Sequence, residues 1–307
     1  MSSKTFALCS IMSLSAGMSI AEAPQVAVDI APVHSLVARV MEGVGTPDLI
    51  IPAGASPHEY NLRPSEAASL QNADVVFWVS ASLTPWMKNA IETLAEDAVV
   101  TELFEVEGTL KLPFRQGVLF EEHDDHEGHD DHEGHNHDGD DPHAWLSPDN
   151  AAVWLNAIAQ TLSKVDPDNA SQYYLNAAAG QKELRELSTK INGILAPFEG
   201  RNFIVFHDAY QYFEKAFDFY AAGAISLSDA RDPSPARIAK IQNRINEQNI
   251  SCILSEPQFN PNIVAAVASG SDVKMGILDP LGVGLELGET LYFQTLHNLA
   301  KALSDCL

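Results

Sequence analysis

The sequence predicts a two-lobed α/β protein, in which mainly parallel strands alternate with helices and one long helix joins the lobes. Short apolar runs alternate with longer segments of helical periodicity along most of the chain. One such segment, residues 171–195, would be about 37 Å long and separates an earlier from a later set of strands. The length of 307 residues, with 46% hydrophobic residues, is enough for two lobes.

The individual elements follow from local patterns. Runs rich in Val, Ile and Phe predict strands, and apolar residues three or four apart predict helices. Ser147-Pro148 and Ser234-Pro235 match an N-cap residue followed by proline in the first helical turn. The expected strands are residues 26–30, 49–51, 74–79, 98–101, 203–206, 219–222, 252–255 and 273–278, of which 219–222 has the weakest pattern. The expected helices are residues 34–42, 65–71, 85–95, 148–163, 171–195, 235–248 and 262–268.

The order of these elements predicts the domain organisation. Residues 24–165 form an N-terminal α/β lobe, residues 166–200 a linking helix, and residues 201–307 a C-terminal α/β lobe. Each lobe alternates strands with helices, which is typical of parallel sheets.

Residues 1–23 have the pattern of a signal peptide. Lys4 supplies a positive charge, residues 6–20 are apolar or small, and Ala21-Glu22-Ala23 matches an A-x-A cleavage site. Lipid attachment at Cys9 is the weaker alternative. No later apolar run reaches about 18 residues, the length of a membrane-spanning helix. The mature chain is therefore expected to be soluble and exported.

Cleavage after residue 23 would leave two cysteines, Cys252 and Cys306. An even pair in an oxidising compartment indicates one disulfide, which would tie the C-terminal tail to a strand. The alternative is two buried free thiols. A cysteine one residue from the C-terminus favours the bridge, because such a position is rarely buried without a covalent tie.

The chain is strongly acidic, with a net charge of −24 at pH 7. Residues 121–143 contribute −11 of this charge, because they hold eleven acidic residues and no Lys or Arg, and the rest of the chain carries −13. This balance argues against binding to nucleic acid or to anionic membrane surfaces.

Residues 121–143, EEHDDHEGHDDHEGHNHDGDDPH, hold seven of the eleven histidines. The segment has no apolar residue before Pro142, so burial cannot offset the entropy of ordering it, and residues 121–141 are expected to form a disordered loop. Imidazoles among carboxylates are typical of loose binding of zinc, copper or nickel. The alternative is a solvated charged segment with no specific role. The auxiliary metal ligands predicted here are His123, His126, His129, His132, His135 and His137.

Four residues besides these six histidines are candidates for one tight metal site. His58, His143, His207 and Asp279 lie beyond strands or at the start of a helix, where open parallel sheets bind ligands. Three imidazoles and one oxygen form a tetrahedral zinc site. Glu59 is a second choice, because neighbouring residues in a loop rarely face the same ion.

Several spaced motifs resemble those of the periplasmic zinc-binding receptors of bacterial ABC transporters. They are, in order, GASPHEYNLRPSEAASLQNADVVFWV, DPHAWLSP, FIVFHDAYQYFEK, SEPQFNP and KMGILDPLG, and the His-rich insertion lies where that family carries one. The resemblance extends from about residue 26 to the C-terminus. It implies two four-stranded lobes joined by one rigid helix, with little closure on binding, and a disulfide between Cys252 and Cys306.

The same resemblance implies that His58, His143 and His207 bind the metal. In related manganese receptors a carboxylate at the position of Asp279 is a ligand and a Glu replaces one histidine, so three histidines favour zinc by ligand softness. Pro57 stands where some zinc receptors carry a Glu ligand. The fourth ligand is therefore either Asp279 or water.

The expected function is capture of periplasmic Zn²⁺ and its delivery to a membrane permease, without enzymatic activity. The chain has no G-x-x-x-x-G-K-[ST] motif, so a separate ATPase would supply the energy. Zn²⁺ is the expected cofactor, the permease the expected protein partner, and a monomer the expected state. The alternatives are a receptor for Mn²⁺ or Cu²⁺, a metal-dependent adhesin on the same scaffold and, with least support, a zinc hydrolase using Glu59 or Glu256 as its base.

Overall fold

The computed structural model describes residues 23–115, 120, 139–226 and 233–307. Its strands are β1 Val26–Ile30, β2 Asp48–Ile51, β3 Val75–Trp78, β4 Val99–Glu102, β5 Phe203–His207, β6 Gly223–Ser226, β7 Cys252–Ser255 and β8 Lys274–Ile277. They form two four-stranded sheets in the orders β2-β1-β3-β4 and β6-β5-β7-β8, and every pairing within them is parallel. The predicted α/β class with two parallel sheets is confirmed.

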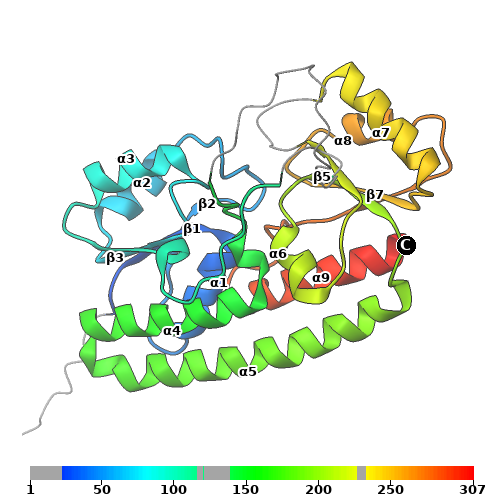
Figure 1. The fold of residues 1–307 in the computed structure, drawn as a ribbon. Coiled ribbons are helices and arrows are strands. Elements are labelled where there is room, and N and C mark those ends of the chain that lie inside the picture. The colour runs from blue at the N-terminus through cyan, green and yellow to red at the C-terminus, as the bar shows by residue number, and fades with distance from the viewer. Residues whose placement is uncertain (1–22, 116–119, 121–138, 227–232) are drawn as a thin grey trace, which may run out of the picture.

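The helices surround these sheets and join them (Figure 1). They are α1 Ala31–Val40, α2 Pro64–Gln71, α3 Pro85–Leu94, α4 Pro148–Val165, α5 Ala170–Leu195, α6 Gln211–Phe217, α7 Pro235–Glu247, α8 Pro261–Ala268 and α9 Leu291–Cys306. Helix α5 spans the width of both lobes, as the long apolar pattern predicts. The side chains of Ser147 and Ser234 cap α4 and α7, with proline in the first turn. Within the described residues, no helix is both long and apolar enough to cross a membrane.

The weak strand predicted at residues 219–222 is wrong. Strand β6 begins at Gly223, which pairs with Ile204 of β5. Among the preceding residues, Phe219 packs on the sheet: its ring stacks on that of Phe203, with centroids 5.4 Å apart. Helix α6, which the sequence patterns do not predict, lies just before these residues and ends at Phe217. The next residue, Asp218, has a left-handed backbone conformation with φ 49°.

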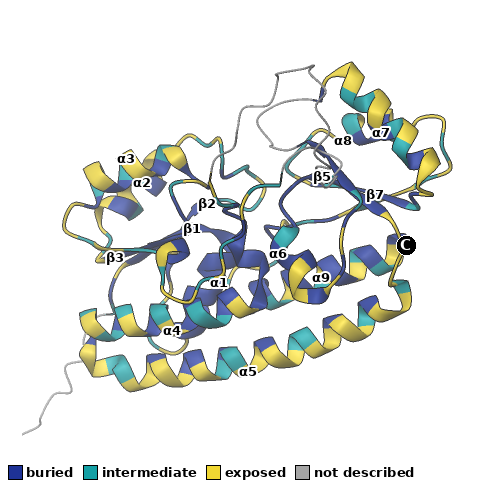
Figure 2. Cartoon of the chain, viewed as in Figure 1, coloured by how far each residue is buried: buried dark blue, intermediate teal, exposed yellow. Residues whose placement is uncertain are grey.

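One apolar core extends beneath both sheets. It contains buried residues of the N-terminal sheet, of α1, α4, α5 and α9, and of one side of the C-terminal sheet. Along β5, Phe203 and Val205 belong to this core, whereas Ile204 and Phe206 belong to a smaller cluster under α7 and α8. Figure 2 shows that the buried side of α5 faces the lobes. A change in the angle between the lobes would expose this shared core to water, which costs free energy.

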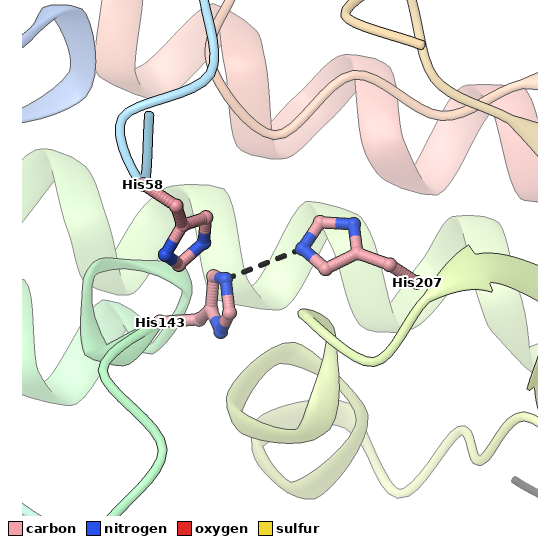
Figure 3. Close-up of side chains that lie close together, drawn as sticks. All are labelled: His58, His143 and His207. Atoms are coloured by element: carbon pink, nitrogen blue, oxygen red, sulfur yellow. Dashed lines mark hydrogen bonds between the residues drawn. The ribbon is translucent and has the colours of Figure 1, made fainter. Parts of the chain in front are cut away.

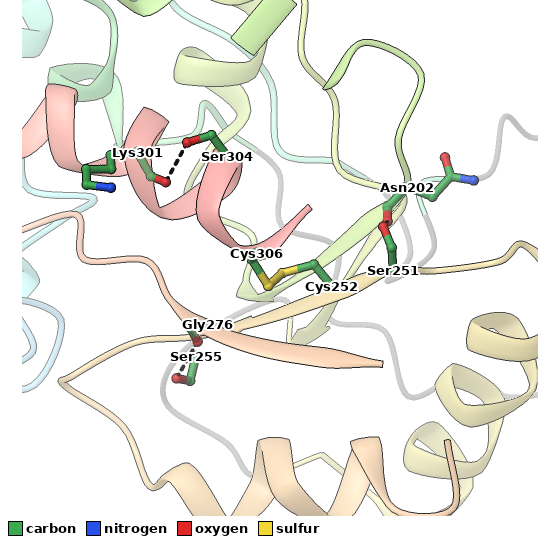
Figure 4. Close-up of a disulfide and its surroundings, with 8 residues drawn as sticks. All are labelled: Asn202, Ser251, Cys252, Ser255, Gly276, Lys301, Ser304 and Cys306. Carbon is green, nitrogen blue, oxygen red and sulfur yellow. Dashed lines mark hydrogen bonds between the residues drawn. A yellow bond between two sulfur atoms is a disulfide. The ribbon is translucent and has the colours of Figure 1, made fainter. Parts of the chain in front are cut away.

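A disulfide joins Cys252 in β7 to Cys306 at the end of α9, as predicted (Figure 4). The two cysteines are 54 residues apart in sequence, and both are buried. The bridge therefore fixes the last helix of the shared core to the C-terminal sheet.

Replacing both Cys252 and Cys306 with Ser should lower the free energy of unfolding by about 4 kcal/mol, because a cross-link over a loop of this length restricts the unfolded chain. Urea unfolding of the oxidised chain and of the double variant measures the difference. The reduced wild-type chain is the control and should match the variant. Equal stability of the oxidised chain and the variant would contradict this prediction.

Candidate metal centre

Three histidines from distant parts of the chain meet between the lobes. One ligand nitrogen from each of His58, His143 and His207 lies within 4.8 Å of the others. Figure 3 shows the three rings gathered around a common point. Among the described residues, this is the one such group of His, Cys, Asp and Glu side chains. These are the three histidines that the sequence predicts as metal ligands.

His58 lies on the connection after β2 and is half-buried. Two hydrogen bonds hold the peptide that links Pro57 to His58. The indole Nε1 of Trp86, in α3, donates to Pro57 O at 2.9 Å, and the backbone nitrogen of His58 donates to Ser56 Oγ at 3.3 Å. The bond from Trp86 thus ties the loop that carries His58 to α3 of the N-terminal lobe.

His143 lies at the start of a single 3-10 turn, Ala144–Leu146, that leads into α4. Its ring Nδ1 lies 2.6 Å from Asp141 Oδ1, and its backbone nitrogen donates to the same oxygen at 3.0 Å. The ring also packs against Trp145, with centroids 5.2 Å apart. Asp141 is fully buried, so this carboxylate serves the histidine rather than solvent.

His207 is the last residue of β5 and is buried. Its Nδ1 lies 2.7 Å from Oε1 of Glu256, which directly follows the neighbouring strand β7. Glu256 is also buried, with 4% of its surface exposed. His143 and His207 therefore each have a buried carboxylate behind the ring, an arrangement typical of metal-binding histidines.

These contacts determine which nitrogen of each ring faces the cavity. A carboxylate can only accept, so the Nδ1 atoms of His143 and His207 carry the ring protons. The two Nε2 atoms, 3.3 Å apart and joined by the dashed line in Figure 3, then present lone pairs to each other. Two nitrogens that each lie about 2.0–2.1 Å from a tetrahedral zinc ion are about 3.3 Å apart. A cation between them would remove the repulsion, and zinc fits the spacing.

Helix α6 of the C-terminal lobe supports Asp141. Gln211 Nε2 donates to Asp141 Oδ2 at 2.9 Å, and Tyr212 Oη donates to the backbone oxygen of Asp141 at 2.7 Å. Burial would raise the pKa of the Asp141 carboxyl, but the charge and hydrogen bonds of His143, with the Gln211 amide, leave the pKa below its ordinary value. Asp141 is therefore ionised over the physiological pH range and holds the His143 ring through a charge-assisted bond.

An arginine connects the same region to α6. Arg115 donates to both carboxylate oxygens of Asp208, the residue after His207, with Nε at 2.9 and 3.1 Å, and to Glu214 at 2.6 Å. Burial raises the pKa of Glu214 to about 7 even though Arg115 opposes the shift. The guanidinium also covers the ring of Phe120, 3.6 Å from its centroid. Arg115 thus balances two buried carboxylates beside the histidine group.

The cavity next to the histidines is small, with a volume of about 20 Å³. Its walls include Pro57, Trp145, Phe259 and Leu281 besides the three histidines. This volume accommodates about one water-sized species. It suits a small ion and is far smaller than the pockets of about 300–1,000 Å³ that hold organic ligands.

A comparison with known protein families matches residues 26–306 to the family described as the periplasmic zinc-uptake complex component A, ZnuA. The chain belongs to the ZnuA family. Its described lobes, parallel sheets and joining helix are those of a ZnuA-like fold.

Curated relatives support the same membership over nearly their full length. The high-affinity zinc uptake system protein ZnuA of Brucella abortus is 41% identical over 314 residues, which cover 95% of this chain and 94% of the relative. ZnuA of Paracoccus denitrificans is 40% identical, with 94% and 93% covered, and ZnuA of Yersinia pestis is 30% identical, with 92% and 91% covered.

Solved structures agree on the fold. A crystal structure of ZnuA matches with a TM-score of 0.76 at 22% identity, and covers 92% of this chain and 99% of that one. The periplasmic zinc binding protein TroA from Treponema pallidum matches with a TM-score of 0.78 at 19% identity, with 92% and 99% covered.

Membership of the ZnuA family makes the chain a transport receptor rather than an enzyme, which confirms that expectation and excludes the hydrolase. The family is described as periplasmic, in agreement with the predicted export. The signal peptide predicted at residues 1–23 lies, except for its last residue, outside the described residues. The auxiliary histidines from His123 to His137 lie outside them too.

Asp279, expected as a possible fourth ligand, is not in the histidine group that the ZnuA-like cavity contains. Its Oδ1 accepts hydrogen bonds from the backbone nitrogens of Leu281 at 3.1 Å and Gly282 at 3.2 Å, and its Oδ2 accepts one from Val283 at 2.5 Å. The carboxylate therefore organises the loop after β8. Glu59 is exposed and also lies outside the group.

Sequence reasoning missed the residues that hold the ligands. Asp141 was counted only as part of the acidic run, although it lies two residues before His143, a spacing that allows a side-chain contact. Glu256 was considered only as a possible base. Its position after β7, beside β5, could have indicated contact with His207. No local pattern points to Arg115 or Gln211, whose partners are about 70 to 100 residues away.

Replacing Arg115 with Met should lower the free energy of unfolding by about 3–5 kcal/mol at pH 8, because two buried carboxylates lose the cation that they face. This loss of unfolding free energy should become smaller as the pH is lowered to 5. Without Arg115 the pKa of Glu214 rises above about 7, so the folded state takes up a proton and gains stability as the pH falls.

Urea unfolding of the metal-free chain at both pH values measures this effect. The matched control replaces the exposed Arg201 with Met, which should change the free energy by less than about 0.5 kcal/mol. An equal loss at pH 8 and pH 5 for the Arg115 variant would be inconsistent with buried, proton-accepting carboxylates.

Proposed function

We propose that His58, His143 and His207 of this receptor capture a single Zn²⁺ ion in the periplasm and release it to the permease of an ABC transporter. The observation that carries this assignment is the pair of Nε2 lone pairs at 3.3 Å, each held by a carboxylate behind its ring. Zn²⁺ is the cargo of such a receptor rather than a resident cofactor.

The donor set favours zinc over harder metals. Imidazole suits zinc and copper, whereas manganese prefers carboxylate and carbonyl oxygens. The described cavity presents three imidazoles, and the nearby carboxylates are used by protein donors. A crystal structure of a ZnuA deletion mutant, which covers 92% of this chain at 22% identity, is described with zinc bound.

We infer that water, rather than Asp279, fills the fourth coordination position. Both oxygens of Asp279 already accept backbone hydrogen bonds, so binding a metal ion through either oxygen would compete with the bonds that hold the loop after β8. Water is also the smallest ligand that could enter a cavity of about 20 Å³.

The proposed delivery step rests on the signal peptide and on the missing nucleotide-binding motif. A signal peptide at residues 1–23 directs it to the periplasm, and the chain contains no nucleotide-binding motif of the Walker type. The loaded receptor therefore docks as a monomer on a membrane permease, and a cytoplasmic ATPase supplies the energy. The six histidines from His123 to His137 collect zinc weakly and raise its concentration near the cavity.

Replacing His207 with Ala should weaken zinc binding by more than about 100-fold, since loss of even a group bonded to a ligand costs 10–100-fold. Titration of the mature protein against a zinc chelator, with Mn²⁺ and Cu²⁺ as competitors, measures affinity and preference. The control is His297→Ala, a histidine of α9 outside the group, which should bind zinc like the wild type.

Two results of that titration would overturn parts of the proposal. Tighter binding of Mn²⁺ than of Zn²⁺ by the wild type would identify another cargo. A loss for Asp279→Asn as large as for His207→Ala would assign the fourth position to Asp279.

Deleting residues 123–137 should remove weak zinc sites and leave one tight site, because the three cavity histidines lie outside the deleted segment. Calorimetry of the deletion variant and the full mature chain measures the number of sites and their affinities. The deletion variant carrying His207→Ala is the control and should show no tight binding. Loss of the tight site by deletion alone would show that the His-rich segment belongs to it.

A further inference from the structure

A glutamine beside the histidines has a buried oxygen with no hydrogen-bond donor. Gln258 follows β7, and its side chain lines the same cavity as His58, His143 and His207. Within the described residues, Gln258 Oε1 is buried and has no hydrogen-bond partner. A buried carbonyl oxygen without a donor costs free energy, so such an atom in a binding cavity points to a partner that arrives with the ligand.

The other end of the same amide fixes its orientation. Gln258 Nε2 donates to the backbone oxygen of Ala53 at 3.0 Å and to Asp279 Oδ1 at 3.1 Å. Both partners are acceptors, so the amide nitrogen must face them and the oxygen must face away. Exchanging the two ends of the amide would bring Oε1 against two other oxygens, and the unsatisfied acceptor is therefore a property of the fold.

We propose that Gln258 is a positioning residue for the metal's fourth ligand, and that its Oε1 accepts a hydrogen bond from a zinc-bound water molecule. This inference rests on the proposed function. Zinc takes Cys, His and carboxylate ligands rather than amide oxygens, and a carboxylate ligand offers no hydrogen to Oε1. A water molecule does, and a metal ion polarises its O–H bonds and strengthens the donation. Water is the species that satisfies both the ion and the amide oxygen in a cavity of about 20 Å³.

The contacts of Gln258 also explain why Gln258, rather than Asp279, accepts the hydrogen bond from the water. Gln258 connects Ala53, on the loop that carries His58, with Asp279, on the loop after β8. Its side chain is thereby held from both lobes, while the Asp279 oxygens are taken up by Gln258 and by backbone nitrogens. A neutral acceptor held in this way orients the water without adding a competing anionic ligand.

The direct test is a crystal structure of the zinc-loaded mature protein. The expected result is one water on the ion, with its oxygen about 2.7–2.8 Å from Gln258 Oε1, the usual distance for such a bond. A protein side chain in the fourth position, or a bound water beyond hydrogen-bond distance of Gln258, would overturn the inference.

Two variants test the same contact in solution through the rate of zinc release to an excess of chelator. Gln258→Met removes both ends of the amide and should release zinc about three- to tenfold faster, the change expected for one lost hydrogen bond. Gln258→Glu keeps an acceptor while losing the donor to Ala53 and Asp279, and should release zinc no faster than the wild type.

A purely structural role predicts instead that both variants release zinc faster, which would overturn the inference. The matched control is Gln181→Met, which removes a glutamine bond to Ala152 O between α5 and α4 and should leave release unchanged. Equal release by Gln258→Met and this control would also overturn the inference while leaving the three-histidine site intact. Failure of the wild-type protein to bind zinc would instead reject the proposed function, so the two failures are distinguishable.

Discussion

The shared apolar core is the constraint on which the rest of this structure depends. The histidines lie on loops and element ends of different lobes, so their spacing is only as constant as the angle between the lobes. That angle is held by α5 and α9, which bury their apolar faces against residues of both sheets. Interlobe hydrogen bonds add to this, such as Trp145 Nε1 to Pro280 O at 3.0 Å and Tyr292 Oη to Trp145 O at 2.7 Å. The site is therefore largely formed when the chain folds, and binding an ion requires little ordering of the protein.

The chemistry of the site also depends on the groups that are hydrogen-bonded to the histidine rings and on the groups that hold them. Asp141 and Glu256 decide which ring nitrogen is protonated, and α6 decides where Asp141 lies. Each of these groups is buried or nearly so, and burial makes their hydrogen bonds strong and their unpaired states costly. Arg115 extends the same arrangement to Asp208 and Glu214. The result is a polar cluster whose members are satisfied mainly by one another.

Local sequence patterns were sufficient for most of the fold and for the three histidines. Strands such as β1 and β7 have strong apolar runs bounded by polar residues or turns, and their predicted bounds match the structure. The His58, His143 and His207 motifs could be recognised because each is a compact run of neighbouring residues.

The failures of the prediction have a different cause. Before β6, Phe219 stacks on Phe203 and does not belong to the strand, and α6 is short, so its pattern is weak. The bonds of Gln211, Arg115 and Gln258 join residues far apart in sequence, and no local periodicity records them.

The balance of charge explains how three imidazoles can accept a doubly charged ion in a nearly dry cavity. Burying an isolated divalent cation would be very unfavourable, because a medium of low polarity replaces its water shell poorly. Here Asp141 and Glu256 place two negative charges behind the ring nitrogens, so that ion and carboxylates together approach neutrality. The carboxylates act through the imidazoles, which become more basic toward the ion.

A metal that binds nitrogen well benefits both from the nearby negative charge and from the more basic imidazoles. A metal that needs direct carboxylate oxygens does not, because the oxygens of Asp279, Asp141 and Glu256 are already engaged by the protein. The proposed preference for zinc thus depends as much on the hydrogen bonds of the carboxylates as on the histidines themselves.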